Sequence, residues 1–519
     1  MSNSGRVEKS MKNMATGLLY RLLATLTAFA VRTVFIKCLS DDYLGVNGLY
    51  SSILSMLSLA ELGFGTAMIY NMYRPLAEKD YQKLAQLMRL YQKVYMIVGT
   101  VIFVIGLCLI PFLDVLIKNP PDISGLKFYY VLYLLNSALS YWFFAYRSSI
   151  LQADQRSYVV SNYSSLFNLI KCAAQILVLL LFRNFTIYLI TEMTCTISLN
   201  ICVAIRVKHD YPVLGKQKGD ELPKEEKKQI FKDVKALMLQ KISFRVLNTS
   251  DSLIISAFVG VSWVGFLSNY LMIIDAIIAV LAQITGAITA SLGNFFAKES
   301  REDGYRLFNR IEFMNFWLFG FTAIAFAVLL NPFMELWLGR LGSEYVLSQG
   351  LVFALVMRFF VEGYMNMMST FRSTLGLFTQ GQYFPPIVAL INIVLSIALS
   401  YPLGAAGVII ATPLARCCIN VWYMPLVLHR DGFKKSVAPF YKKMLLHMIF
   451  LVGVTAVIFL LSKEVIFKDG VTILTFCAMA VIVAIVPNLV FALTFWKTDE
   501  CRYFKQILKE KSHALLHRG

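Results

Sequence analysis

Residues 471–496 read VTILTFCAMAVIVAIVPNLVFALTFW, a run of 26 residues without a charged side chain. An α-helix needs about 20 mostly apolar residues to cross the hydrocarbon layer of a membrane, so this run predicts a transmembrane helix. The whole chain has the same character, with 58% hydrophobic and 15% charged residues. Soluble domains have about 45–50% apolar and about 25% charged residues, so the composition excludes a soluble globular protein.

Similar apolar runs recur along the chain and predict an all-α polytopic membrane protein of about 14 transmembrane helices. The runs lie at 14–38, 44–70, 92–113, 128–151, 158–182, 185–205, 236–259, 263–293, 313–337, 347–378, 386–402, 404–428, 444–462 and 471–496. The eleventh and twelfth runs, which meet at Tyr401–Gly404, could instead form one broken pair.

Basic residues gather in alternate loops. The formal net charge is +18, and with a cytoplasmic N-terminus the inner segments hold roughly five times as many Lys and Arg residues as the outer segments. This bias places both termini in the cytoplasm, because basic loops stay on the inner side. Anionic lipid then accounts for the charge, and no nucleic-acid partner is expected. The nine cysteines show no metal-ligand spacing, and no Walker loop occurs, so we expect no metal, no cofactor and no enzyme activity.

The sequence also matches itself at an offset of about 220 residues. The matching positions are Gly45 with Gly265, Tyr50 with Tyr270, Ala77 with Ala297 and, at an offset of 225, Arg147 with Arg372. Both copies begin on the same side, so they are parallel repeats. We expect two six-helix lobes, 1–205 and 236–430, around a central cavity that opens by alternating access. A cytoplasmic basic linker at 206–235 joins them, and 431–519 adds two helices and a cytoplasmic tail.

One stretch of the first repeat resembles a known family. The segments are RTVFI at 32–36, YLGVNGLY at 43–50, LAELG at 59–63 and YRPLAEKD at 73–80. They resemble the start of bacterial polysaccharide transporters, the flippases of O-antigen and capsule repeat units. These belong to a superfamily with the multidrug-and-toxin exporters and the lipid II flippase.

The resemblance implies a multi-pass protein of the bacterial cytoplasmic membrane that moves undecaprenyl-diphosphate-linked oligosaccharide from the inner to the outer leaflet. Membrane lipids surround it, and glycosyltransferases and a polysaccharide polymerase are the expected partners. Two alternatives stay open within the superfamily: a multidrug or metabolite exporter, and the lipid II flippase itself. An exporter of organic cations would favour acidic cavity residues, whereas the charges within the spans are mostly basic. A polymerase would need a large outer loop, and none is present.

Ionisable residues inside a membrane need a partner or a water-filled cavity. Arginine suits a diphosphate because its planar guanidinium donates two parallel hydrogen bonds and stays charged when buried. We therefore predict a basic substrate site in the cavity, formed by Arg21, Arg32, Arg245, Asn248, Arg358 and Glu362, with an intrahelical pair between Glu362 and Arg358. For Arg147, Arg372 and Lys241 we favour snorkelling to the membrane surface.

Two acidic residues, Glu61 and Asp275, lie within the second and eighth spans. They either bind a coupling ion, Na⁺ or H⁺, or neutralise nearby arginines. The resemblance to the lipid II flippase implies a sodium site in the second lobe, for which Asn392 and Thr412 are polar positions. Ser396 stands where a carboxylate would be expected in such a site.

Overall fold

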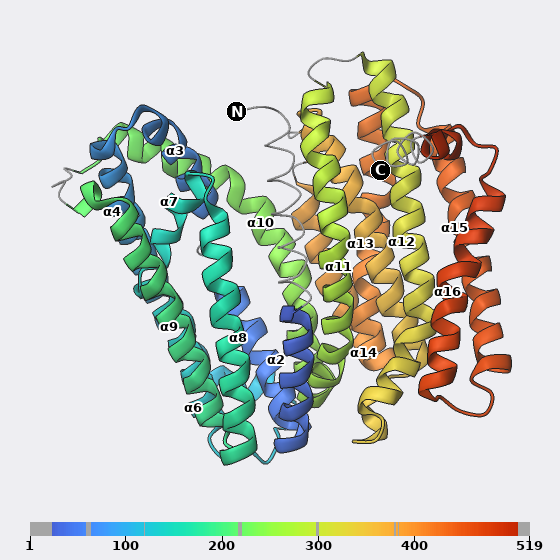
Figure 1. The fold of residues 1–519 in the computed structure, drawn as a ribbon, viewed down its shortest axis with the longest axis horizontal. Coiled ribbons are helices and arrows are strands. Elements are labelled where there is room, and N and C mark those ends of the chain that lie inside the picture. The colour runs from blue at the N-terminus through green and yellow to red at the C-terminus, as the bar shows by residue number, and fades with distance from the viewer. Residues whose placement is uncertain are drawn as a thin grey trace, which may run out of the picture. The chain divides into compact units, whose positions relative to one another are not determined.

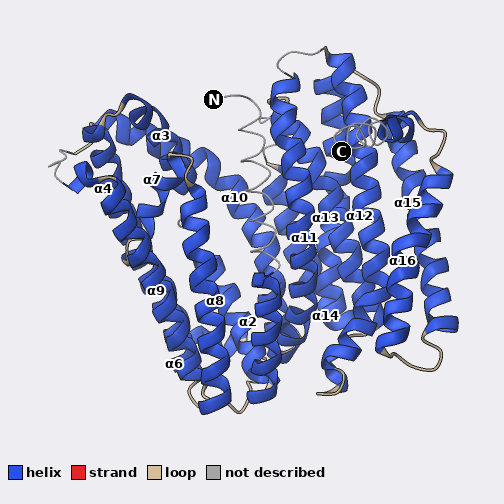
Figure 2. Ribbon diagram, viewed as in Figure 1, coloured by secondary structure: helices blue, strands red, loops and turns tan. Residues whose placement is uncertain are grey.

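The computed structural model describes residues 23–58, 64–118, 120–215, 221–296, 300–377, 380–381 and 383–506. These residues form helices joined by short loops, and they contain no strand (Figure 2). Nine of the described helices are long and apolar enough to cross a membrane. The all-α polytopic class predicted from the sequence is therefore confirmed, and the chain is a multi-pass membrane protein.

A helix over residues 23–38 comes first in the described chain. The helices that follow are α2 (Asp41–Leu57), α3 (Phe64–Glu78), α4 (Tyr81–Leu109), α5 (Leu113–Leu116), α6 (Leu126–Trp142), α7 (Ser148–Ala153), α8 (Ser157–Phe182), α9 (Phe185–Asp210), α10 (Lys224–Phe258), α11 (Val261–Phe296), α12 (Arg301–Leu338), α13 (Gln349–Thr374), α14 (Phe384–Val427), α15 (Ala438–Leu461) and α16 (Ile473–Thr494). Short π-helical turns, Leu428–Phe433 (η6) and Ser462–Ile466 (η7), follow α14 and α15.

The chain divides into two compact units, residues 1–268 and 269–519, with the division inside α11. In the first unit α4 packs on α6, α6 on α9 and α9 on α8. Helices α8 and α9 are the long teal and green helices of Figure 1. Helix α10 packs on α2 and α3. It begins at Lys224, so part of the predicted linker 206–235 is helical. The lobe boundaries expected from the sequence stay a prediction.

In the second unit α12 is the central helix. It contacts α13 on one side and both α15 and α16 on another, and it holds 18 buried residues, which include Phe308, Phe316 and Ile324. The last two helices, red in Figure 1, therefore pack on the core of this unit through α12.

The internal duplication is visible in the helix boundaries. Helices α2 and α11 begin 220 residues apart, as do α4 and α12. The N-caps repeat as well: the side chain of Asp80 accepts a hydrogen bond from the backbone N–H of Lys83, and that of Ser300 from the N–H of Asp303. Such caps satisfy the free N–H groups of a first helical turn, so both repeats start these helices by the same means.

Helix α14 covers two predicted spans, and the chain reverses within it. Gly404 has φ 57° and ψ −137°, a conformation that favours glycine because it lacks a Cβ atom. Beyond it, Gly407 lies so close to Leu399 that a Cβ would stand 2.0 Å from the carbonyl oxygen of that residue. The eleventh and twelfth predicted spans are therefore the two arms of a helical hairpin that turns at Gly404.

Candidate functional site

Arg32 lies in the helix 23–38 of the first unit. Its guanidinium Nη1 donates to the hydroxyl of Ser268 at 3.1 Å, and that hydroxyl donates in turn to the carbonyl of Gly265 at 2.7 Å. The hydroxyls of Tyr133 and Tyr188 are within electrostatic range. The polar groups around this arginine are thus neutral ones.

Arg245 occupies a similar setting on α10. Its Nη1 donates to the hydroxyl of Ser55 on α2 at 3.0 Å. One turn earlier, Lys241 donates to the hydroxyl of Thr66 at 2.8 Å. The side-chain amide of Asn248 donates to the carbonyl of Phe244 in its own helix at 2.8 Å, so its N–H group is already engaged.

Arg32 and Arg245 share one electrostatic property. Within the part of the chain that the structure describes, neither guanidinium has a carboxylate within ion-pair distance. A serine hydroxyl satisfies one N–H group but carries no charge. Both side chains are partly buried, and a guanidinium with neutral neighbours can bind an anion through its N–H groups.

The second unit has a different pattern, in which acids accompany the arginines. Arg416 on α14 pairs with Glu362 on α13 at 3.3 Å, and its side chain is only 9% exposed. Asp275 on α11 is within electrostatic range of Arg358 and of Glu362. Glu362 is thus ion-paired with Arg416 on a neighbouring helix. The predicted pair between Glu362 and Arg358 stays a prediction.

The two predicted amide and hydroxyl ligands, Asn392 and Thr412, lie together on the arms of the α14 hairpin. The amide of Asn392 donates to the hydroxyl of Thr412 at 2.9 Å, and both side chains are fully buried. Ser396, one turn beyond Asn392, is also fully buried, and its hydroxyl makes no hydrogen bond within the described residues. The hairpin thus brings this polar set together, but its role in binding an ion stays a prediction.

Four further residues that the sequence analysis singled out remain to be located in the structure. Arg21 and Glu61 lie outside the described residues. Arg372 donates to the carbonyl of Leu377 at 2.8 Å, just past the end of α13, and Arg147 donates to the carbonyl of Ala204 at 3.4 Å. Both arginines therefore bind backbone groups at helix ends. Their interaction with lipid headgroups is untested.

Four charged residues in the long apolar helices were not among the positions predicted from the sequence. Arg416 lies in the middle of an apolar run but was not connected to Glu362, because the contact depends on the α14 hairpin. Lys171 and Glu192 pair at 3.8 Å between α8 and α9. Glu312 is fully buried in α12 although it stands immediately before the predicted span 313–337. The available signal was a charged residue inside an apolar run, as for Arg416, Lys171 and Glu192, or directly at its edge, as for Glu312.

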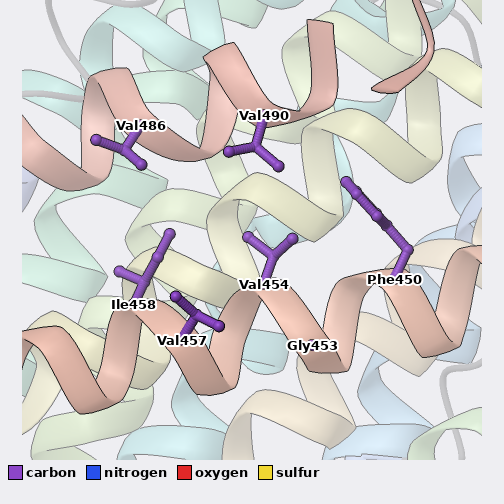
Figure 3. Close-up of a pocket in the computed structure, with 7 residues that line it drawn as sticks. All are labelled: Phe450, Gly453, Val454, Val457, Ile458, Val486 and Val490. Atoms are coloured by element: carbon purple, nitrogen blue, oxygen red, sulfur yellow. The ribbon is translucent and has the colours of Figure 1, made fainter. Parts of the chain in front are cut away.

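A separate pocket lies between α15 and α16. Its volume is about 360 Å³, and its lining residues are Phe450, Gly453, Val454, Val457, Ile458, Val486 and Val490. Figure 3 shows the valine and isoleucine side chains of the two helices directed into the space between them. The lining is wholly apolar, so this pocket can accept hydrocarbon but offers nothing to bind a phosphate or a sugar.

Comparison with known proteins places the fold. Residues 19–177 match the MatE family model. A search of curated proteins gave no match. Among solved structures, an inward-facing multidrug resistance MATE family transporter of the MOP superfamily is similar with a TM-score of 0.62 and 15% identity, over 80% of this chain and 99% of that chain.

Two further solved structures extend this comparison. The lipid II flippase MurJ in an inward closed conformation gives a TM-score of 0.58 at 15% identity, over 91% of this chain and 99% of that chain. A MOP superfamily transporter from Pyrococcus furiosus gives a TM-score of 0.52 at 15% identity, over 82% of this chain and 97% of that chain. The chain therefore has the MATE-like fold of these transporters.

Proposed function

We propose that this chain is a flippase that moves undecaprenyl-diphosphate-linked oligosaccharide repeat units from the inner to the outer leaflet by alternating access. The observation that carries the proposal is the setting of Arg32 and Arg245. Each guanidinium lies on a helix that the sequence predicts to cross the membrane, and within the described residues its partner is a serine hydroxyl and not a carboxylate. A diphosphate supplies the missing negative charge.

Arginine is chemically suited to this substrate. Its planar guanidinium can donate two parallel hydrogen bonds to neighbouring phosphate oxygens, and it stays charged when removed from water. The hydroxyls of Ser268 and Ser55 each occupy one N–H group, at 3.1 and 3.0 Å, and within the described residues the other N–H groups of each guanidinium have no protein partner. We infer that these serines hold the guanidinium groups in place before the substrate arrives.

The extent of the structural match supports a lipid-linked substrate. The match to the lipid II flippase covers 91% of this chain, compared with 80% for the multidrug transporter. That protein is a flippase of a lipid, lipid II. A polyprenyl carrier also needs an apolar surface for its long tail, and the pocket between α15 and α16 is one apolar surface of this kind.

A multidrug exporter is the second candidate, because the multidrug transporter gives a higher TM-score, 0.62 compared with 0.58. Export of an organic cation would use acids, and the second unit has Asp275 and Glu362. Glu362 is paired with Arg416, however, and Asp275 is within electrostatic range of Arg358. Because cations already surround both acids, we favour the anionic substrate.

The two functions separate in one reconstituted system. The purified protein is reconstituted into vesicles that contain a fluorescent undecaprenyl-diphosphate oligosaccharide. A quencher added outside the vesicles then reports, as loss of fluorescence with time, how fast the labelled lipid reaches the outer leaflet. We expect the labelled lipid to reach the outer leaflet only when the protein is present, and we expect no transport of a cationic dye. Dye transport without movement of the lipid would instead establish the exporter.

The cellular setting follows from this function. We expect the protein in the bacterial cytoplasmic membrane, supplied by glycosyltransferases that build the repeat unit and followed by a polymerase that consumes it. The energy source is either Na⁺ or H⁺, for which Asp275, Asn392 and Thr412 are the described candidates. Replacing Na⁺ by choline in the vesicle assay, at several pH values, distinguishes the two ions.

A further inference from the structure

Glu312 stands at the centre of a buried charged cluster in the second unit. Its side chain is fully buried on α12 and accepts a hydrogen bond from the hydroxyl of Tyr364 on α13 at 2.6 Å. From α15, Lys443 Nζ lies 2.9 Å from Glu312 Oε2, and His447 Nδ1 lies 3.7 Å from Oε1. Lys443 also pairs at 3.0 Å with Glu500, which follows α16. These five residues are called the Glu312 cluster.

The charges of the Glu312 cluster do not balance when the histidine is neutral. Glu312 and Glu500 contribute two negative charges, and Lys443 contributes one positive charge. One further proton makes the cluster neutral. Since an uncompensated charge in a buried site is costly, a neutral cluster is favoured once the helices are packed. Histidine is the side chain whose charge changes most easily near neutral pH, so His447 is the natural carrier of this proton.

The packing around His447 fixes its ring beside the carboxylate. The ring stacks on Phe316, with 4.1 Å between centroids and 14° between planes, and Phe495 meets it edge-on at 5.3 Å. His447 is only 4% exposed, and within the described residues its buried Nδ1 atom makes no hydrogen bond. This Nδ1 atom faces Glu312 Oε1 at 3.7 Å, and a small movement of the ring would bring the two atoms within hydrogen-bond distance.

Other titratable groups near Glu312 are arranged differently. His429 of η6 is within electrostatic range, but its Nδ1 atom is hydrogen-bonded to the carbonyl of Pro425 at 2.8 Å. Arg310 on α12 lies over the ring of Tyr503 at 3.8 Å. Lys443 and Glu500 are partly exposed, at 26% and 19% of their side chains. They therefore connect the buried carboxylate to solvent.

We propose that the Glu312 cluster is a binding site for one exchangeable proton, shared between the Glu312 carboxylate and the His447 imidazole. Binding of the proton places a positive ring beside the carboxylate and closes the 3.7 Å gap, which strengthens the attachment of α15 to α12 and α13. Release of the proton leaves an excess negative charge between these helices and weakens the attachment. The site is independent of the substrate proposed above.

The direct test is a titration of the histidines in the full-length protein. The chain has five histidines, so protein labelled with ¹³C at the histidine Cε1 position gives few signals, and loss of one in His447→Gln assigns it. We expect the His447 signal to respond to binding and release of the proton. Glu312→Gln should move its midpoint to lower pH by about one unit or more, because a neighbouring negative charge favours the imidazolium ion.

Further variants keep the test decisive if Glu312→Gln does not fold. Tyr364→Phe removes only a hydroxyl that stabilises the carboxylate, and it should move the His447 midpoint to higher pH. His429→Gln, a change of the other buried histidine, should leave the midpoint in place. A His447 signal that does not move across pH 5 to 9, or a midpoint that neither Glu312→Gln nor Tyr364→Phe shifts, would overturn the proposal.

Discussion

The hydroxyl of Ser262 donates a hydrogen bond to Asp42 Oδ1 at 3.0 Å, and the two residues are 220 positions apart in the sequence. This is the offset at which the chain matches itself. Gly45 and Gly265 are a second pair at the same offset, and a Cβ on Gly265 would stand 2.8 Å from the backbone nitrogen of Gly45. Helices α2 and α11 therefore meet through equivalent positions of the two repeats.

This crossing leads to a stability prediction. A Cβ on Gly45 would lie 2.4 Å from the carbonyl oxygen of Val261, so Gly45→Ala should separate the helices and destabilise the protein by about 1–3 kcal/mol. Thermal unfolding in detergent measures the effect. Gly453→Ala is the matched control, since no atom lies within 4 Å of the added methyl group, and it should cause no loss. Equal melting temperatures for both variants would contradict the tight crossing.

The Arg416–Glu362 pair predicts non-additive mutations. Arg416→Met leaves Glu362 without this partner and Glu362→Gln leaves Arg416 without its carboxylate, so each single change should destabilise the protein. The cost should fall below the roughly 3–5 kcal/mol of a fully buried pair, because the Glu362 side chain is 28% exposed. The double variant should be more stable than the sum of the two losses implies. Additive melting shifts would show that the pair contributes nothing.

Cysteine labelling tests the membrane topology that the basic loops predict. Single cysteines at Lys224 and Lys505, introduced into a variant without native cysteines, should react only with reagents that enter the cell. A cysteine at Pro121 should react with an impermeant reagent in whole cells. If Lys505 lies outside, the prediction of 14 spans is wrong, because only an even number of spans returns both ends of the chain to one side of the membrane.

Glu221 predicts a pH-dependent contact between the start of α10 and α4. Hydrogen bonds from Lys227 at 2.7 Å and Lys93 at 2.5 Å lower the pKa of Glu221 from 4.5 to about 2. The contact is therefore complete above pH 4.5 and is lost as the pH falls towards about 2. At neutral pH, Glu221→Gln should increase hydrogen exchange at the first turns of α10. The effect should weaken in high salt, because these side chains are exposed.

The sequence was sufficient for the helices and for the duplication. Apolar runs predict helices because the side chains of a membrane helix face either lipid or the protein interior, and both are apolar. The sequence offset of 220 residues agrees with the starts of α2 and α11 and of α4 and α12. The sequence did not predict which residues the charged side chains pair with. Glu362 meets Arg416 only because α14 folds back on itself at Gly404, and the sequence left that reversal open.

Glu312 illustrates a second limit. Hydropathy placed it just outside a span, where a charged residue would be solvated. The structure buries it because α15 brings Lys443 and His447 against α12, in contacts between residues more than 130 positions apart. Such pairings depend on which helix faces which, and a single sequence holds no direct record of that arrangement.

The central claim is that arginines with neutral partners bind the diphosphate of the lipid carrier. Its most direct measurement is the rate at which the labelled undecaprenyl-diphosphate oligosaccharide reaches the outer leaflet in vesicles with Arg245→Ala, Arg245→Lys or Arg32→Ala at equal protein content. Arg74→Ala is the control, since Arg74 is exposed and already paired with Glu78 at 2.8 Å.

We expect Arg245→Ala and Arg32→Ala to abolish movement of the lipid, Arg245→Lys to reduce it partially, and Arg74→Ala to leave it unchanged. Lysine keeps the charge but loses the planar pair of donors, which accounts for the intermediate rate. Thermal unfolding of each variant shows that the protein is folded. Movement of the lipid at the unmutated rate in both Arg245→Ala and Arg32→Ala would contradict the claim.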